Sequence, residues 1–146
     1  MDNAELYNLG DVAITAAVTN SVITTASDAN GATQAYIDDL DGMLSATIQA
    51  NFTYGSGGTT VRLMIETSLD QGTTWIEVWR ALFGTASEEN VINLSALTPK
   101  TSPVTPAALS DDTCLDGIFG PRWRAKITST GTYAGNTSLA VRLNAR

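Results

Sequence analysis

The residues of this chain that could do chemistry are its carboxylates, because it contains no His and only one Cys. Without His there is no Ser–His or Cys–His nucleophile and no His-bearing zinc site, and Cys114 alone forms neither an intrachain disulfide nor a thiolate metal cage. A glycosidase needs two carboxylates across a cleft, and the spacing of the acids selects no such pair. We therefore expect a protein that is not an enzyme. Six of the 15 acids form two groups, Asp38, Asp39 and Asp41, and Asp111, Asp112 and Asp116.

The first acidic group has two interpretations. Clustered hard oxygens on a loop are what Ca²⁺ prefers, whereas an Asp-Gly pair such as Asp41-Gly42 is also an ordinary turn. The run does not have the spacing of an EF-hand loop. We expect no cofactor and no metal site, and leave calcium at this loop as the open alternative.

Three cations alternate with apolar residues in the segment 122–128. Arg122, Arg124 and Lys126 face one way, while Trp123, Ala125 and Ile127 face the other. We predict that this basic face and the acids Asp38, Asp39 and Asp41 form a contact between subunits. The alternative is a solvated strand face, or a sheet edge that charge protects from pairing.

The net charge of −7 is unevenly distributed, since residues 1–61 hold seven acids and no base. An acidic first part beside a neutral remainder suits contacts between subunits, although plain solubility explains it as well. The negative sign disfavours nucleic acid as a partner. No stretch reaches the roughly 20 apolar residues of a membrane span, and the acidic N-terminus lacks the features of a signal peptide. We expect no membrane partner.

Period-two alternation predicts most of the secondary structure. Residues 44–54 alternate without a break, which fits a half-buried antiparallel strand. Residues 59–67 and 76–79 continue the pattern on either side of a turn, so we predict a three-stranded meander over residues 44–79. Further strands are expected at 12–18, 21–25, 87–94 and 122–128, and in a last strand with Leu139, Val141 and Leu143 in the core.

These segments indicate an all-β protein, an antiparallel β-sandwich of the jelly-roll-like kind. We expect an N-terminal arm at residues 1–10 and one sandwich domain over residues 11–146. Residues 97–112 contain Pro99, Pro103 and Pro106, each of which removes a backbone donor, and predict a long loop. A loop of this length in a compact domain is commonly functional or reaches a neighbour.

The turn between the strands at 59–67 and 76–79 resembles the Asp-box hairpin of sialidases and other β-proteins. The residues that carry the match are Ser68, Asp70, Gly72, Thr74 and Trp75. In those proteins the box is a structural turn away from the catalytic centre, so the resemblance implies a fold feature without an activity. We expect Trp75 to fold over the hairpin. Trp75, Trp79 and Trp123 could also form a sugar-binding platform, but core packing is favoured.

From residue 40 to the end, the chain resembles a group of small structural proteins of tailed bacteriophages and prophages. The matching pieces are residues 45–58, 66–76, 116–124 and 130–136 and the terminal Val141-Arg142-Leu143. The resemblance implies a virion component with a jelly-roll or sandwich fold and no catalytic position. The first choice is a capsid decoration (cement) protein, a homo-oligomer with a trimer favoured, bound to the major capsid protein or neighbouring virion subunits. Such a protein is expected to be assembled in the host cytoplasm and to lie in the virion, with the capsid surface favoured. A head–tail neck or tail component is the runner-up, and a carbohydrate-binding module follows.

Overall fold

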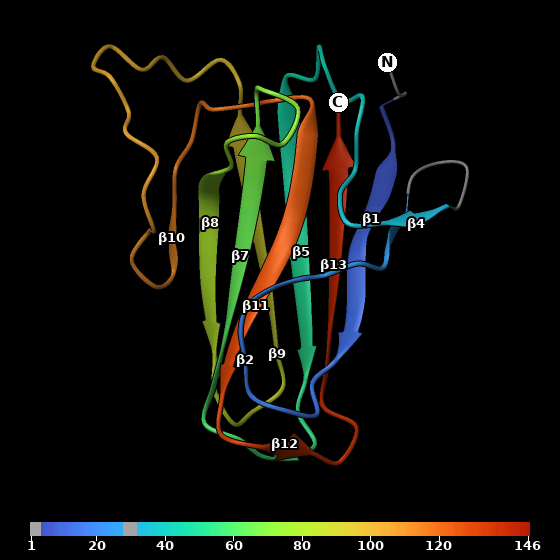
Figure 1. Ribbon diagram of the computed structural model, residues 1–146. Helices are drawn as coiled ribbons and strands as arrows, with labels where there is room; N and C mark the ends of the chain where they lie inside the picture. Colours follow the sequence, from blue (N-terminus) through green and yellow to red (C-terminus); the bar gives the residue numbers. More distant parts are fainter. Residues whose placement is uncertain (1–3, 28–31) are drawn as a thin grey trace.

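Alternating apolar and polar residues form thirteen strands in residues 4–27 and 32–146, the part of the chain that the computed structural model describes. No α-helix occurs there (Figure 1). The strands are β1 (Leu6–Ala13), β2 (Val18–Val22), β3 (Ala26–Ser27), β4 (Thr33–Gln34), β5 (Ser45–Thr53), β6 (Ser56–Gly57), β7 (Thr60–Ser68), β8 (Ile76–Phe83), β9 (Glu88–Ser95), β10 (Thr113–Cys114), β11 (Arg122–Thr130), β12 (Tyr133–Ala134) and β13 (Ser138–Ala145).

The strands form two large antiparallel sheets that pack face to face. The first has the order β4-β3-β1-β13-β5-β9 and the second β10-β8-β7-β11-β2, while β6 and β12 pair at one end. Among the eight longer strands, every connection crosses between the sheets except the β7–β8 hairpin. The resulting four-strand orders, β1-β13-β5-β9 and β8-β7-β11-β2, are those of a jelly roll. The prediction of an all-β, jelly-roll-like sandwich is confirmed.

The core lies between the two sheets and follows the predicted alternation. On β5, Ala46, Ile48, Ala50 and Phe52 are buried, and the residues between them are partly or fully exposed. The ring of Phe52 stacks on Phe83 of the opposite sheet, with 5.1 Å between ring centroids. The predicted inward faces of the last two long strands are also buried: Trp123, Ala125, Ile127, Leu139, Val141 and Leu143.

The meander predicted over residues 44–79 is wrong. Strand β5 pairs with β13 and β9 in the first sheet, whereas β7 and β8 belong to the second sheet. Gly57 and Gly58 adopt positive φ, of 70° and 69°, and carry the chain across the end of the sandwich, where β6 pairs with β12. Alternation alone gives the same pattern for a hairpin and for such a crossover, so the sequence does not distinguish them.

The prediction of an N-terminal arm over residues 1–10 needs correction. Residues 6–10 belong to β1, which pairs with β13 along its length, and residues 1–3 lie outside the described part. Tyr7 and Leu9 are buried, and Gly10 has a φ of 141° at a bulge that shifts the register. The strand predicted at residues 12–18 is accordingly replaced by the end of β1 and a connection to β2. The sequence pattern did not indicate this strand because Asn8, Gly10 and Asp11 are residue types that are typical of loops.

The β6–β12 end of the sandwich yields a test of the fold. A Cβ on Gly58 would lie 2.3 Å from the ring of Tyr133, and the residue has positive φ. We expect Gly58→Ala to lower the free energy of unfolding by about 2–4 kcal/mol, the sum of left-handed strain and overpacking. Urea unfolding measures this difference.

Gly84 provides the matched control, since a Cβ there would meet nothing within 4 Å. Gly84→Ala should change the free energy of unfolding by less than about 1 kcal/mol. Equal stabilities of the two variants would show that the close approach of Tyr133 to Gly58 is wrong.

Candidate interaction surface

The β7–β8 turn is built by the five residues predicted for it. The N–H of Gly72 donates to Oγ of Ser68 over 2.8 Å, and the Ser68 hydroxyl donates to Oδ1 of Asp70 over 2.9 Å. The same carboxylate oxygen accepts the N–H of Thr74 at 2.7 Å. Gly72 has a φ of 89°, which glycine adopts without strain. The ring of Trp75 lies against the turn, 3.4 Å from the position of a Cβ on Gly72, as expected for a side chain that folds over the hairpin.

Hydrogen bonds to the turn change the titration of Asp70. The Thr74 N–H, with further help from the hydroxyls of Thr74 and Ser68, holds the pKa of this carboxyl below its usual value. The turn therefore depends on an ionised Asp70. Its role is structural, because each acceptor contact is made within the turn.

A network of ion pairs covers the outer face of the second sheet. Oε1 of Glu66 lies 2.8 Å from Nε of Arg124, and Oε2 lies 3.0 Å from Nζ of Lys126. Glu77 stands directly opposite Glu66 in the β7–β8 register and accepts two hydrogen bonds from Arg80, of 2.9 and 3.0 Å. Both glutamates are buried. The two like charges are thus neutralised by cations on β8 and β11, the two strands that flank β7.

The predicted contact between subunits uses charges that this chain already pairs. Nε of Arg122 lies 3.1 Å from Oδ1 of Asp38, and Arg122 also donates to the carbonyl of Gln71 in the β7–β8 turn. Arg124 and Lys126 are both paired with Glu66. The three cations of the basic face are therefore paired with acids of the same chain, so little of their positive charge is available to a neighbouring subunit. Asp39 and Asp41 are exposed and line a shallow hollow beside Arg122.

The tryptophans are used in packing. Trp79 and Trp123 are 3% and 1% exposed, as the core interpretation predicted. The guanidinium of Arg124 lies 4.1 Å from the ring centroid of Trp75, and Tyr36 approaches that ring with 6.4 Å between centroids. Arg122 in turn lies 4.6 Å from the Tyr36 centroid. Trp75 is half-buried between the guanidinium of Arg124 and the turn, and the three indoles form no shared platform.

The proline-containing segment 97–112 contains no strand, as predicted, but its last residues are tied to the ion-pair network. The N–H of Leu109 donates to Glu77 over 2.7 Å, and Asp111 lies 2.8 Å from Nε of Arg62. The Arg62 guanidinium holds the pKa of Asp111 below its usual value. Asp112 accepts the N–H of Leu82 at 3.0 Å. A cavity of about 290 Å³ remains between residues 106–108 and the ion pairs.

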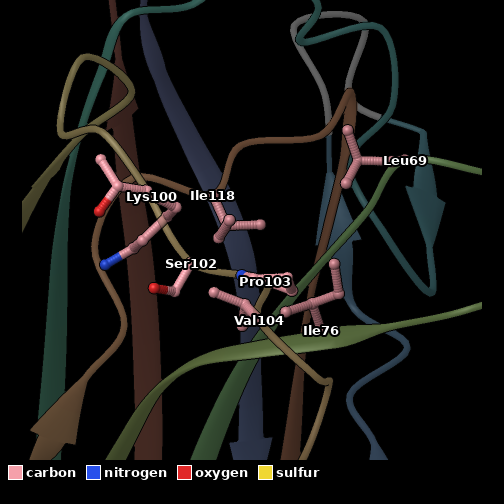
Figure 2. A pocket seen from close by; sticks show the side chains of 8 residues that line it. Leu69, Ile76, Lys100, Ser102, Pro103, Val104 and Ile118 are labelled. Atoms are coloured by element: carbon pink, nitrogen blue, oxygen red, sulfur yellow. The ribbon is translucent and has the colours of Figure 1, made fainter.

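The other end of this loop borders a more apolar hollow of about 530 Å³. Figure 2 shows Ile76, Pro103 and Val104 grouped in it, with Leu69 on the side of the β7–β8 turn and Lys100 across from it. Leu69 is 61% exposed and Val104 37%. We call the surface formed by Leu69, Ile76, Lys100, Pro103, Val104 and Ile118 the turn-end surface. Leu44, just before β5, and Leu97, just after β9, are also exposed.

The two groups of acids singled out in the sequence do not meet at one cleft, and only the first group lines a hollow together. Asp38 and Asp111 are held by arginines, and Asp112 caps a backbone N–H. Asp116 accepts the N–H of Ser95 at 2.7 Å and the hydroxyl of Thr98 at 2.9 Å. Sequence reasoning missed Glu66 and Glu77, the most buried acids described. Their alternation with apolar residues marks them as outward-facing, but their burial depends on the register with β11 and on the loop above them.

The lowered pKa of Asp70 gives a pH test. Because its folded-state pKa lies below the unfolded value of about 3.9, its contribution to stability is present above that pH and is lost as the pH falls through the folded pKa. Asp70→Asn keeps an acceptor oxygen without the titration. We expect the urea midpoint of this variant to fall less than that of the wild type between neutral pH and pH about 3.

Asp41→Asn is the control, since Asp41 is exposed in a neighbouring turn. It should follow the wild-type pH dependence. Parallel curves for Asp70→Asn and the wild type would show that the carboxylate does not hold the turn.

Among the described residues, no group of three or more His, Cys, Asp or Glu side chains could hold a metal ion. The same part of the chain includes no helix with the length and apolar character of a bilayer span. Comparison of the chain with protein-family models, with curated proteins and with solved structures finds no match.

Proposed function

We propose that this chain is a non-enzymatic structural protein of a tailed-phage virion, a capsid decoration protein that stabilises the shell through contacts between subunits. The proposal combines the phage resemblance of residues 40–146 with the nature of the exposed surface. Its partner is the major capsid protein or a neighbouring virion subunit. Repetition on a symmetric shell would strengthen many weak contacts, and a homo-oligomer, with a trimer favoured, would add to this effect.

The observation that carries the proposal is the turn-end surface. Leu69 and Val104 are exposed around a hollow whose floor includes Ile76 and Ile118. Isolated exposed apolar residues are common, but a group of them around a concavity is typical of a protein contact. The loop 97–112 forms one wall of this hollow, as expected of a loop that reaches a neighbour.

The arrangement of charges supports a structural role over a catalytic one. The buried Glu66 and Glu77 are matched by cations within hydrogen-bonding distance. A general acid or base needs a carboxylate that can reach a substrate, whereas these oxygens are occupied by guanidinium, ammonium and backbone donors. The burial of Trp79 and Trp123 in the core likewise argues against a sugar-binding platform of three indoles.

Charge substitutions on the turn-end surface test the proposal. We expect Leu69→Asp and Val104→Asp each to weaken binding to particles that lack this protein by about tenfold or more, since a carboxylate would be buried at the contact. Binding is measured by co-sedimentation of purified protein with such particles. Urea unfolding should show that both variants are folded, because the substituted side chains are exposed.

Leu6→Asp is a matched control, because Leu6 is 64% exposed but lies on β1 of the other sheet. It should bind within about twofold of the wild type. Binding by both turn-end variants at wild-type strength would contradict the proposed surface. Failure of the wild-type protein to bind any such particle would contradict the function itself.

A further inference from the structure

Strand β9 is the longest edge strand of the sandwich. The other edges are β4 and β10, of two residues each, and β2, of five, whereas β9 has eight. In the described part of the chain β9 pairs with β5 alone. An edge strand presents a row of backbone groups that can pair with another strand. This row is therefore the largest unpaired backbone surface among the edges.

The hydrogen bonds at the end of β9 show which of its residues face the free edge. The N–H of Ser95 donates sideways to Asp116 over 2.7 Å, while the next N–H, of Ala96, donates toward β5, to the carbonyl of Leu44, over 2.8 Å. Backbone groups two residues apart point the same way in a strand. The N–H and C=O of Glu89, Val91 and Asn93 thus point away from β5. At Ser95 the N–H is already bound to Asp116, so it cannot pair with an added strand.

These three residues are spaced symmetrically about Val91, so the edge is complementary to itself. An antiparallel copy centred on Val91 places Val91 opposite Val91 and Glu89 opposite Asn93, which allows two hydrogen bonds at each of three residue pairs. A shift by two residues in one direction brings Ser95 into the ladder, where Asp116 already occupies its N–H. A shift in the other direction leaves only two pairs within β9. The centred register makes the most hydrogen bonds.

The side chains and charges agree with this register. Val91 is 57% exposed and would be covered by Val91 of the second copy. The Asn93 amide can donate to the Glu89 carboxylate opposite it. The two Glu89 residues stand four positions apart, about 14 Å, beyond the Debye length of about 8 Å at physiological ionic strength. A parallel pairing would instead set the acids Glu88 and Glu89 side by side with those of the other copy.

A hollow lies beside this edge, where the added strand would place its inner side chains. It has a volume of about 260 Å³ and is bounded by β9 between Glu88 and Ile92 and by Trp79, Asp112 and Cys114 of the facing side. In the centred register, Ile92 of the second copy stands next to Asn90 and points into this hollow. Glu89, Val91 and Asn93 are all exposed along this edge.

We propose that two copies of this chain pair through β9, antiparallel and centred on Val91, so that the two β5–β9 sheets become one continuous sheet. The contact is isologous and gives a two-fold dimer. It uses a surface separate from the turn-end surface and does not depend on a virion role. A two-fold contact cannot by itself close the trimer favoured from the sequence, so a trimer would have to use another surface.

The test is the molar mass of the purified full chain over a concentration series, by sedimentation velocity. We expect the wild type to move from 15.4 kDa toward twice that mass as concentration rises. Val91→Pro should remain monomeric, because it removes an N–H that faces the free edge while β5–β9 pairing keeps its hydrogen bonds. Val91→Glu should also remain monomeric, because it sets two carboxylates directly opposite each other at the two-fold axis.

Val91→Thr is the control, since it keeps a β-branched side chain and the N–H, and it should dimerise like the wild type. Hydrogen exchange at the amides of Glu89, Val91 and Asn93 should slow as the dimer forms. A wild type that stays monomeric overturns the proposal. So does a dimer or trimer that persists in Val91→Pro and Val91→Glu, since its contact would lie elsewhere.

Discussion

The need to neutralise buried carboxylates organises the second sheet. Glu66 and Glu77 face each other across β7 and β8, and a buried charge is stable only with close partners. Arg124 and Lys126 on β11 and Arg80 on β8 supply those partners, and the N–H of Leu109 brings the proline-containing loop to the same place. The network therefore sets the register of three strands and fastens the loop. It also withdraws the basic face of β11 from contacts with other molecules.

The jelly-roll path determines what remains exposed. Every long strand except the β7–β8 pair alternates between sheets, so the connections gather at the two ends of the sandwich. Glycine-mediated crossovers close one end against Tyr133, and the other end presents the Asp-box turn, the chain's C-terminus and the loop 97–112 (Figure 1). Rigid strands thus support one end with exposed apolar residues. That division between a closed and an accessible end is what a subunit needs in order to bind a neighbour in one orientation.

Local patterns predicted the parts of this structure that depend on neighbours in sequence. Alternation located β5 and β11, and the spacing of Ser68, Asp70 and Gly72 predicted a turn that is held by hydrogen bonds among residues 68–74. Features that depend on residues far apart in the sequence were not predicted. The glycine-rich segment 55–58 did not indicate whether β7 joins the sheet of β5. The ion pair between Glu66 and Arg124 joins residues 58 positions apart, so no local pattern predicts it. The predicted subunit contact at Asp38 and Arg122 had complementary charges, which the fold brings together within one chain.

The central claim is that this jelly roll is a structural subunit that binds a repeating shell. The most direct measurement is the copy number of the protein in purified particles of the tailed phage that this account assigns it to, by quantitative mass spectrometry against the major capsid protein. The account predicts a fixed ratio, near one to one or one oligomer for every few capsid subunits. A few copies per particle would place the protein in the neck or tail instead, and its absence from particles would contradict the account.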